Sequence, residues 1–383
     1  MKNFYPLTLI VTLLLGVTSS LSAQQNLWRS DSAQSPVVHD DGSVTLRLYA
    51  PNAESVSATG DFTNGGEVAL TRREDGVWEY HSEPLASELY SYSFIVDGMR
   101  DVRDPSNSYV MRDVGSVFNY FIVPGERGRL YSAQQVAHGT VARVWAPVED
   151  GRERRMVIYT PAGYADSEQH YPTLYLLHGM GGDEEAWLAT GRLAEIMDNL
   201  IAEGKAKPMI VVMTNGCTRH NAAPGYSEEG MWRPYMSGSM DGSFETMFPS
   251  VVEWVDSHYR TIAEKSSRAI AGLSMGGFHS MQISKEYPTM FDYVGLFSAA
   301  IFRGNEEVAT YQRLEEKLAK QFADQPKLYW IGIGEEDFLY EDNVKYRQLL
   351  DQKGYKYSYY ESDGGHIWRN WRIYLTIFAQ QLF

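Results

Sequence analysis

The chain has 383 residues, of which 44% are apolar and 22% are charged, so a single small domain and a disordered chain are both excluded. Lys and Arg number 34 against 49 Asp and Glu, and the net charge of −15 offers no broad basic surface for nucleic acid. The one cysteine, Cys217, excludes an internal disulfide and a multi-thiolate metal site. We expect two domains, or one large domain with an appendage.

Residues 1–23 have the order of a secretory signal peptide. Lys2 supplies the positive charge, an apolar run extends from Leu7 to Val17, and small residues follow it. This run is shorter than the roughly 20 residues that a membrane-spanning helix needs. We therefore expect no membrane span and an exported protein, secreted or periplasmic, whose mature chain begins near Gln24.

Short runs of alternating polar and apolar residues dominate residues 24–124. Examples are Ser43–Tyr49 and Tyr90–Val96, and both runs end at turn residues. Such a pattern predicts short strands and, for the segment as a whole, a small all-β sandwich. Residues 125–135 follow, and their polar, glycine-punctuated start predicts a linker.

Residues 136–383 change to strands that alternate with helices. The apolar runs Met156–Thr160, Thr173–Leu177 and Met209–Met213 read as strands that are buried on both faces, and Gly191–Glu203 reads as a helix. This alternation predicts an α/β domain with a mostly parallel central sheet.

The hexapeptide Gly272-Leu273-Ser274-Met275-Gly276-Gly277 fits the G-x-S-x-G pattern, in which a serine sits on a sharp turn between a strand and a helix. An apolar strand is expected before it and a helix, Phe278–Glu286, after it. The flanking glycines remove side chains that would collide at such a turn. Ser274 is therefore the candidate nucleophile.

A serine needs a neighbouring base, which in turn needs a carboxylate to orient it. His279 and His366 are the histidines after Ser274, and His366 lies in a turn before the final helix, so we assign it as the base. The acid is expected at the end of the strand Leu328–Ile333. Asp337 is our choice, and Glu335 and Glu336 are adjacent competitors.

Two backbone amides are needed to stabilise an oxyanion. One is expected from Met275, which follows the nucleophile, and the other from Met180, in the glycine-rich loop after the strand Thr173–Leu177. His178 begins this loop, and we expect it to brace the loop rather than to react. The catalytic groups imply neither a metal nor an organic cofactor.

These motifs, with Tyr259-Arg260-Thr261 and Gly365-His366, resemble those of the esterase D-like α/β-hydrolases that include carbohydrate esterase family 1, the feruloyl and acetylxylan esterases. The segment Leu46–Pro124 is similar to the early-set, immunoglobulin-like modules of carbohydrate-binding module family 48, on the motifs Tyr49-Ala50-Pro51, Gly60-Asp61-Phe62 and Tyr90–Gly98. The resemblance implies an α/β-hydrolase fold behind an immunoglobulin-like sandwich. It also implies an enzyme that removes ester groups from plant cell-wall xylan, with Ser274, Asp337 and His366 as its triad.

A long loop between Gly216 and Phe244 is rich in aromatic residues, and loops of this length often line a site. We expect a slot for a flat phenolic acyl group, because aromatic side chains stack on such groups. The alternative is that these aromatics pack the loop onto the sheet. The candidate substrate-binding residues are Tyr226, Trp232 and Tyr235 of this loop, together with Trp187 after the oxyanion loop and Trp368 after His366.

The leading hypothesis is a serine esterase that hydrolyses ferulate esters on arabinoxylan or its oligosaccharides through an acyl-enzyme. Acetylxylan esterase is the close alternative, and an esterase acting on siderophores or other small esters is a third. A non-catalytic glycan-binding protein is the alternative from another class, and the unbroken set of catalytic groups argues against it.

Overall fold

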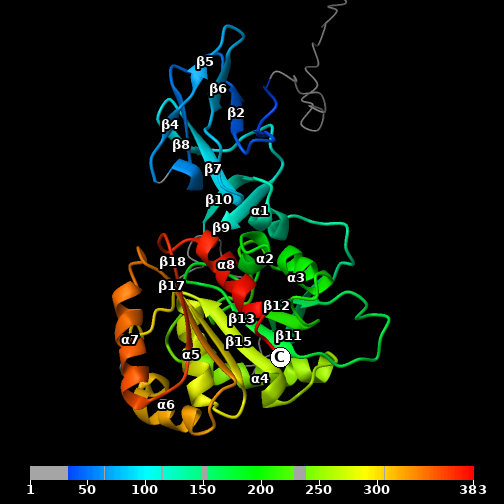
Figure 1. The fold of residues 1–383 in the computed structure, drawn as a ribbon, viewed down its shortest axis with the longest axis vertical. Helices are drawn as coiled ribbons and strands as arrows, with labels where there is room; N and C mark the ends of the chain where they lie inside the picture. Colours follow the sequence, from blue (N-terminus) through cyan, green and yellow to red (C-terminus); the bar gives the residue numbers. More distant parts are fainter. Residues whose placement is uncertain (1–32, 64, 114, 148–152, 228–238, 306) are drawn as a thin grey trace, which may run out of the picture.

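The computed structural model describes residues 33–63, 65–113, 115–147, 153–227, 239–305 and 307–383. The expected signal peptide lies outside these residues. A β-sandwich comes first in the chain and lies at one end of the molecule, and a larger α/β domain follows it (Figure 1). Among the described residues, no helix combines the length and the apolar character required to cross a bilayer.

The sandwich consists of two antiparallel sheets whose facing residues form its core. In one sheet the strand order is β1 (Val37–Val38), β2 (Val44–Tyr49), β6 (Val77–His81), β5 (Thr71–Arg72). In the other it is β4 (Val68–Ala69), β3 (Val56–Gly60), β7 (Leu89–Val96), β10 (Ser116–Ile122), β9 (Val110–Asp113), with β8 (Met99–Val102) paired to β7 and the 3-10 turn η2 (Asp61–Thr63) after β3. Trp78 belongs to this core, and its indole N–H donates to the Ala50 carbonyl oxygen at 2.9 Å.

The expected linker carries a short helix, α1 (Glu126–Tyr131), that packs on the α/β domain. Tyr131 is buried there, and the Asn199 side-chain amide donates to the carbonyl oxygens of Leu130 and Ser132, each at 3.0 Å. Gly128 serves close packing rather than flexibility, because a Cβ at this position would lie 2.0 Å from the Val123 carbonyl oxygen. The connection between the domains is therefore anchored.

In the part of the chain that the structure describes, the α/β domain has an eight-stranded sheet. Its strand order is β11 (Thr140–Pro147), β12 (Glu153–Thr160), β14 (Ile210–Thr214), β13 (Thr173–Leu177), β15 (Arg268–Leu273), β16 (Tyr293–Phe297), β17 (Leu328–Gly334), β18 (Ser358–Ser362). The pairs β11–β12 and β12–β14 are antiparallel and the others are parallel. The predicted mostly parallel sheet is confirmed, and it is the sheet of an α/β-hydrolase.

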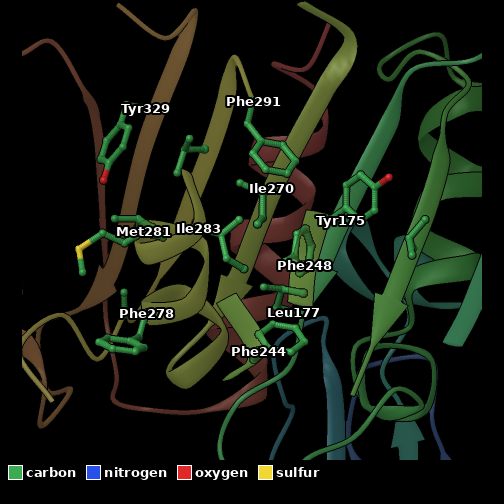
Figure 2. Packing of buried hydrophobic residues seen from close by; sticks show 14 of the residues in the cluster. Tyr175, Leu177, Phe244, Phe248, Ile270, Phe278, Met281, Ile283, Phe291 and Tyr329 are labelled. Carbon is green, nitrogen blue, oxygen red and sulfur yellow. The ribbon is translucent and has the colours of Figure 1, made fainter. Parts of the chain in front are cut away.

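Helices cover both faces of this sheet, because successive side chains of a strand point to opposite sides. Tyr175 and Leu177 of β13 face a cluster built with α4 (Ser243–His258) and α5 (Met275–Glu286), which Figure 2 shows. Also on this side lie η4 (Ala309–Tyr311), α6 (Leu314–Ala323) and α7 (Tyr340–Lys353), and the short turn η3 (Lys265–Ser267) directly precedes β15. Leu174 and Leu176 face the second cluster, with α2 (Ala186–Ala189), α3 (Leu193–Ala202) and α8 (Trp368–Ala379).

The sandwich is docked on the second cluster, which includes Leu89 of β7 and Met111 of β9. A buried ion pair crosses the same contact, since Arg372 Nη2 of α8 lies 3.2 Å from Glu88 Oε1, and their side chains are 1% and 3% exposed. Arg372 also donates to the carbonyl oxygens of Leu89 and Thr190, each at 3.1 Å. Shared apolar packing and a buried ion pair therefore join the two domains.

Candidate active site

Ser274 occupies the sharp turn between β15 and α5, with φ 54° and ψ −113°. A non-glycine residue rarely adopts a positive φ, and such strain costs about 1–3 kcal/mol. Three backbone hydrogen bonds hold this conformation: the Ser274 N–H donates to Phe297 at 2.8 Å, and the Ser274 carbonyl accepts from Phe278 and Ala300, each at 3.0 Å. The surrounding sheet and helix therefore fix the serine above the carboxyl end of β15.

Glycines around the turn let three backbone segments approach each other. A Cβ at Gly276 would lie 2.4 Å from the Leu177 carbonyl oxygen, and a Cβ at Gly179 would lie 2.4 Å from Leu273 Cδ1. Real Cβ atoms do not approach this closely, so a larger residue would push the loop after β13 away from Ser274. The predicted role of the flanking glycines agrees with this geometry.

His366 and Asp337 come together from the ends of β18 and β17. His366 Nδ1 lies 2.8 Å from Asp337 Oδ2 and 3.0 Å from Oδ1, and the Asp337 carboxylate is fully buried. The competing carboxylates of Glu335 and Glu336 are exposed. Among the three adjacent acids, Asp337 is thus the one placed to orient the imidazole.

Ser274 and His366 line one pocket of about 230 Å³. Residues of both domains form its wall: Asp113, Gly179, Met180, Gly182, Ala186, Leu273, Ser274, His366, Trp368 and Trp371. The hydroxyl nucleophile and the imidazole therefore face the same small space, which is the arrangement that acyl transfer to a serine requires.

The two expected oxyanion donors lie beside this pocket. Met275 is the first residue of α5, and the amides of a helix's first turn have no partner within the helix. Met180 lies in a turn closed by the Gly182 N–H donating to the Gly179 carbonyl at 3.1 Å, and Gly181 supplies the positive φ of 84° that the turn needs. Neither amide donates a hydrogen bond to another described residue.

His178 braces the oxyanion loop, as predicted. Its Nε2 accepts the Gly216 N–H at 2.8 Å, so Nδ1 carries the proton and donates to the Gly179 carbonyl oxygen at 2.7 Å. Burial lowers the pKa of His178, which keeps the ring neutral and preserves this pair of hydrogen bonds.

The five candidate substrate-binding aromatic residues have different surroundings in the structure. Trp368 lines the pocket, whereas Trp187 is buried behind it, with its indole N–H donating to the Leu177 carbonyl at 3.0 Å and its ring 5.3 Å from that of Trp368. The expectation that Trp187 contacts substrate is wrong, because core packing holds it. Tyr226 is 62% exposed, lies over the Arg155 guanidinium, and does not line the pocket. Trp232 and Tyr235 lie outside the described residues.

The pocket residues Trp371 and Asp113 were not identified from the sequence. Trp371 is three residues beyond Trp368 on α8, so helical spacing brings it to the same face, and its ring lies 4.9 Å from that of His366. This three-residue spacing could have identified Trp371 from the sequence. Asp113 comes from β9 of the sandwich, and no local pattern links it to the hydrolase motifs.

Among the described residues, no group of three or more His, Cys, Asp and Glu side chains is arranged to hold a metal ion. The residues around Ser274 can perform serine-based acyl transfer, because they include a strained nucleophile, an imidazole oriented by a buried carboxylate, and two backbone amides beside the shared pocket.

Residues 149–380 match the family model described as a putative esterase, and residues 33–110 match carbohydrate-binding module 48, the isoamylase N-terminal domain. The chain therefore belongs to the putative esterase family, with an N-terminal module of carbohydrate-binding module family 48. Both resemblances seen in the sequence are confirmed.

The chain is 30% identical over 372 residues to an endo-1,4-beta-xylanase/feruloyl esterase of Xylanibacter ruminicola; the match covers 91% of this chain and 46% of that relative, so the chain spans about half its length. A ferulic acid esterase of Anaeromyces mucronatus is 22% identical, with a TM-score of 0.53 over 66% of this chain and 94% of its own. The enterobactin esterase of Shigella flexneri is 16% identical, with a TM-score of 0.64 over 88% and 92%. These two structures establish the fold alone. Residues 149–380 are therefore an esterase-family domain, and the chain is related to a xylanase/feruloyl esterase.

Proposed function

We propose that the protein is a secreted or periplasmic feruloyl esterase that releases hydroxycinnamates from arabinoxylan or its oligosaccharides. Ser274 Oγ attacks the ester carbonyl carbon while His366 Nε2 takes its proton, and the amides of Met180 and Met275 stabilise the oxyanion. His366 then protonates the departing sugar oxygen. Water, activated by the same imidazole, cleaves the acyl-enzyme and restores Ser274.

The observation that carries this proposal is the aromatic wall beside the nucleophile. Trp368 and Trp371 line the pocket with Ser274, their ring centroids are 5.2 Å apart, and Met180 lines the pocket as well. Aromatic and methionine side chains bind a flat phenolic ring well, whereas an acetyl group needs no such surface. The similarity to the Xylanibacter ruminicola xylanase/feruloyl esterase supports the same substrate class.

A groove between the domains supports a polysaccharide as the alcohol part of the ester. It has a volume of about 760 Å³ and is lined from the sandwich by Asp61 and Tyr90 and from the hydrolase domain by Asp363 and Arg369. Gly365 and Ile367, the neighbours of His366, line it as well. Polar and aromatic groups next to the catalytic imidazole suit the hydroxyls and apolar faces of a sugar chain.

The deciding experiment compares kcat/KM of the mature enzyme on methyl ferulate, an acetylated xylo-oligosaccharide and a siderophore triester, with Ser274→Ala as the matched control. We expect fastest release of ferulate and loss of all three activities in the variant. Faster release of acetate, or faster siderophore cleavage, would select the corresponding alternative. Equal rates for wild type and Ser274→Ala would remove the serine mechanism.

Export is part of the proposal and is tested separately. The basis is the charge, apolar run and small residues of segment 1–23. Expression of the full chain in a bacterium that secretes proteins, followed by mass spectrometry of the product, should give a mature chain that begins near Gln24. A product that retains segment 1–23 in the cytoplasm would contradict export.

A further inference from the structure

The sandwich domain contributes a charged side chain to the pocket of the hydrolase domain. β9 ends at Asp113, and Asp113 lines the same pocket of about 230 Å³ as Ser274 and His366. β9 lies where the sandwich meets the α/β domain, close to α2 and α8 (Figure 1). The pocket wall is therefore complete only when both domains are present.

The residues before Asp113 anchor it to the hydrolase domain. Arg112 Nη2 lies 2.5 Å from Asp183 Oδ2, and Asp183 is a buried residue just beyond the oxyanion turn. Thr190 Oγ1 donates to the Arg112 carbonyl oxygen at 3.2 Å, and Met111 is buried in the cluster shared by the two domains. Three consecutive residues of β9 thus contact the α/β domain, and this docking fixes where Asp113 stands relative to Ser274.

Because most of the pocket wall is apolar, the Asp113 carboxylate can distinguish substrates by their hydroxyl groups and their charge. Among the described lining residues, Asp113 and His366 are the ionisable ones, and Met180, Leu273, Trp368 and Trp371 form the apolar surface. A carboxylate accepts strong hydrogen bonds from hydroxyl groups and repels anions, and both effects are larger beside an apolar wall than in water. A site that hydrogen-bonds a substrate hydroxyl rejects analogues that lack it.

We propose that Asp113 is a specificity-determining residue: its carboxylate accepts a hydrogen bond from a hydroxyl of the bound ester, which makes the sandwich domain a working part of the active site. The hydroxyl is either the phenol of the acyl group or an alcohol of the sugar. This assignment rests on the proposed function, in which the substrate is a phenolic acid ester of a sugar.

The test measures kcat/KM for wild type, Asp113→Leu and the control Asp101→Asn, an exposed sandwich aspartate outside the pocket. The substrates are methyl ferulate, methyl 3,4-dimethoxycinnamate, which lacks the phenol, and feruloyl arabinose. Each readout is a ratio of two substrates within one protein, so a change in the folded fraction cancels.

If the phenol is the partner, wild type should prefer methyl ferulate to the dimethoxy ester by about tenfold to a hundredfold, the ratio expected of a hydrogen bond to a charged group. Asp113→Leu should bring this ratio close to one, and Asp101→Asn should keep it. If the sugar is the partner, Asp113→Leu should instead reduce the preference for feruloyl arabinose over methyl ferulate. The inference is overturned if the variant changes all three substrates by one common factor.

The charge is tested with Asp113→Asn, which keeps the shape of the side chain. Methyl 4-carboxycinnamate, with an anion in place of the phenol, should gain in kcat/KM relative to methyl cinnamate when the carboxylate becomes an amide. If the preceding test identifies the phenol as the partner, an unchanged ratio would contradict the charged role. Faster acetate release by the wild type would defeat the feruloyl proposal, and an altered sugar preference in Asp113→Leu would still establish the contact.

Discussion

Asp337 receives the Nδ1–H of His366 through both carboxylate oxygens, at 2.8 and 3.0 Å, while its own side chain is fully buried. An ionised carboxylate can only accept hydrogen bonds, so the proton resides on Nδ1 and leaves Nε2 free to take a proton from Ser274. This contact joins the ends of the neighbouring parallel strands β17 and β18. The tautomer of His366 therefore depends on Asp337.

Replacing Asp337 by Asn should reduce kcat for methyl ferulate by about 10⁴-fold, because an amide supports the wrong imidazole tautomer. Glu335→Gln is the matched control, since Glu335 is exposed and two residues away, and it should retain wild-type kcat. Steady-state kinetics on the two purified variants measures both effects. A similar loss in Glu335→Gln would show that the acid has been assigned to the wrong carboxylate.

Substitutions of Ser274 should separate activity from backbone strain. Ser274→Ala and Ser274→Gly should each lose at least about a thousandfold in kcat, because both remove the nucleophile. Glycine adopts the positive φ of 54° without the steric penalty of a Cβ, so Ser274→Gly should also raise the free energy of unfolding by about 1 kcal/mol over Ser274→Ala. Urea denaturation of the two variants gives the difference, and equal stabilities would mean that the elbow is not strained.

Removing the brace under the oxyanion loop should affect both stability and catalysis. His178→Asn leaves the Gly216 N–H and the Gly179 carbonyl without their present partner, and we expect a loss of about 1–3 kcal/mol in the free energy of unfolding. Because Gly179 starts the turn that carries Met180, kcat should fall while KM changes little. Unchanged kcat in a destabilised variant would restrict His178 to a structural role.

The pH dependence of this brace follows from the lowered pKa of His178, whose main cause is burial. A base with a depressed pKa in the folded state protonates first in the unfolded chain, so its contribution is present above the unfolded pKa of about 6.5 and is lost as the pH falls below it. Urea denaturation at pH 7.5 and 5.5 should show this loss in wild type. The difference between the two pH values should be smaller in His178→Asn.

Removing one partner of the ion pair between the domains should lower the free energy of unfolding strongly, whereas replacing both partners by apolar residues should lower it little. Arg372→Met leaves the buried Glu88 carboxylate with the more distant Arg127, at 3.9 Å, as its ionic partner, and we expect a loss of about 3 kcal/mol, which Glu88→Leu in the same chain should largely restore. Arg100→Met is the control, because the side chains of the Arg100–Glu67 pair are 60% and 43% exposed, and this substitution should change the free energy of unfolding much less than Arg372→Met does.

The same pair has a defined pH signature. Burial raises the pKa of Glu88 above its ordinary value although Arg372 opposes the shift, so the folded state takes up a proton more readily than the unfolded state. This contribution favours folding at low pH and is lost as the pH rises from about 4.5 through the folded pKa. The destabilisation of Arg372→Met should therefore be larger at pH 8 than at pH 5, and the opposite order would contradict the assignment.

Several residues of the candidate active site could be predicted from local sequence motifs. The Gly272–Gly277 motif predicts the turn at Ser274, because the need for small residues beside a sharp strand-to-helix corner is a property of a few adjacent positions. The strand Thr173–Leu177 and the glycines after it likewise place the oxyanion loop. His366 followed from elimination among the few histidines after the nucleophile.

Other features depended on contacts between distant segments. Gly128 and its polar neighbours have the composition of a flexible linker, yet packing against Val123 and Asn199 makes the segment a docked helix. Trp187 and Trp368 look equally suitable as substrate contacts in the sequence, and only the packing of α2 against β13 buries the first and leaves the second in the pocket wall.

The sequence alone determined the fold class, the order of the two domains and the residue types of a serine esterase, because periodicity, turn chemistry and motif spacing are local properties of the chain. The tertiary structure decided which of three neighbouring acids meets His366, and that Asp113 reaches the pocket from another domain. The first outcome depends on the register of the sheet, and the second depends on how the sandwich docks on the α/β domain. Side chains that are far apart in the sequence meet only when the register and the docking are both fixed.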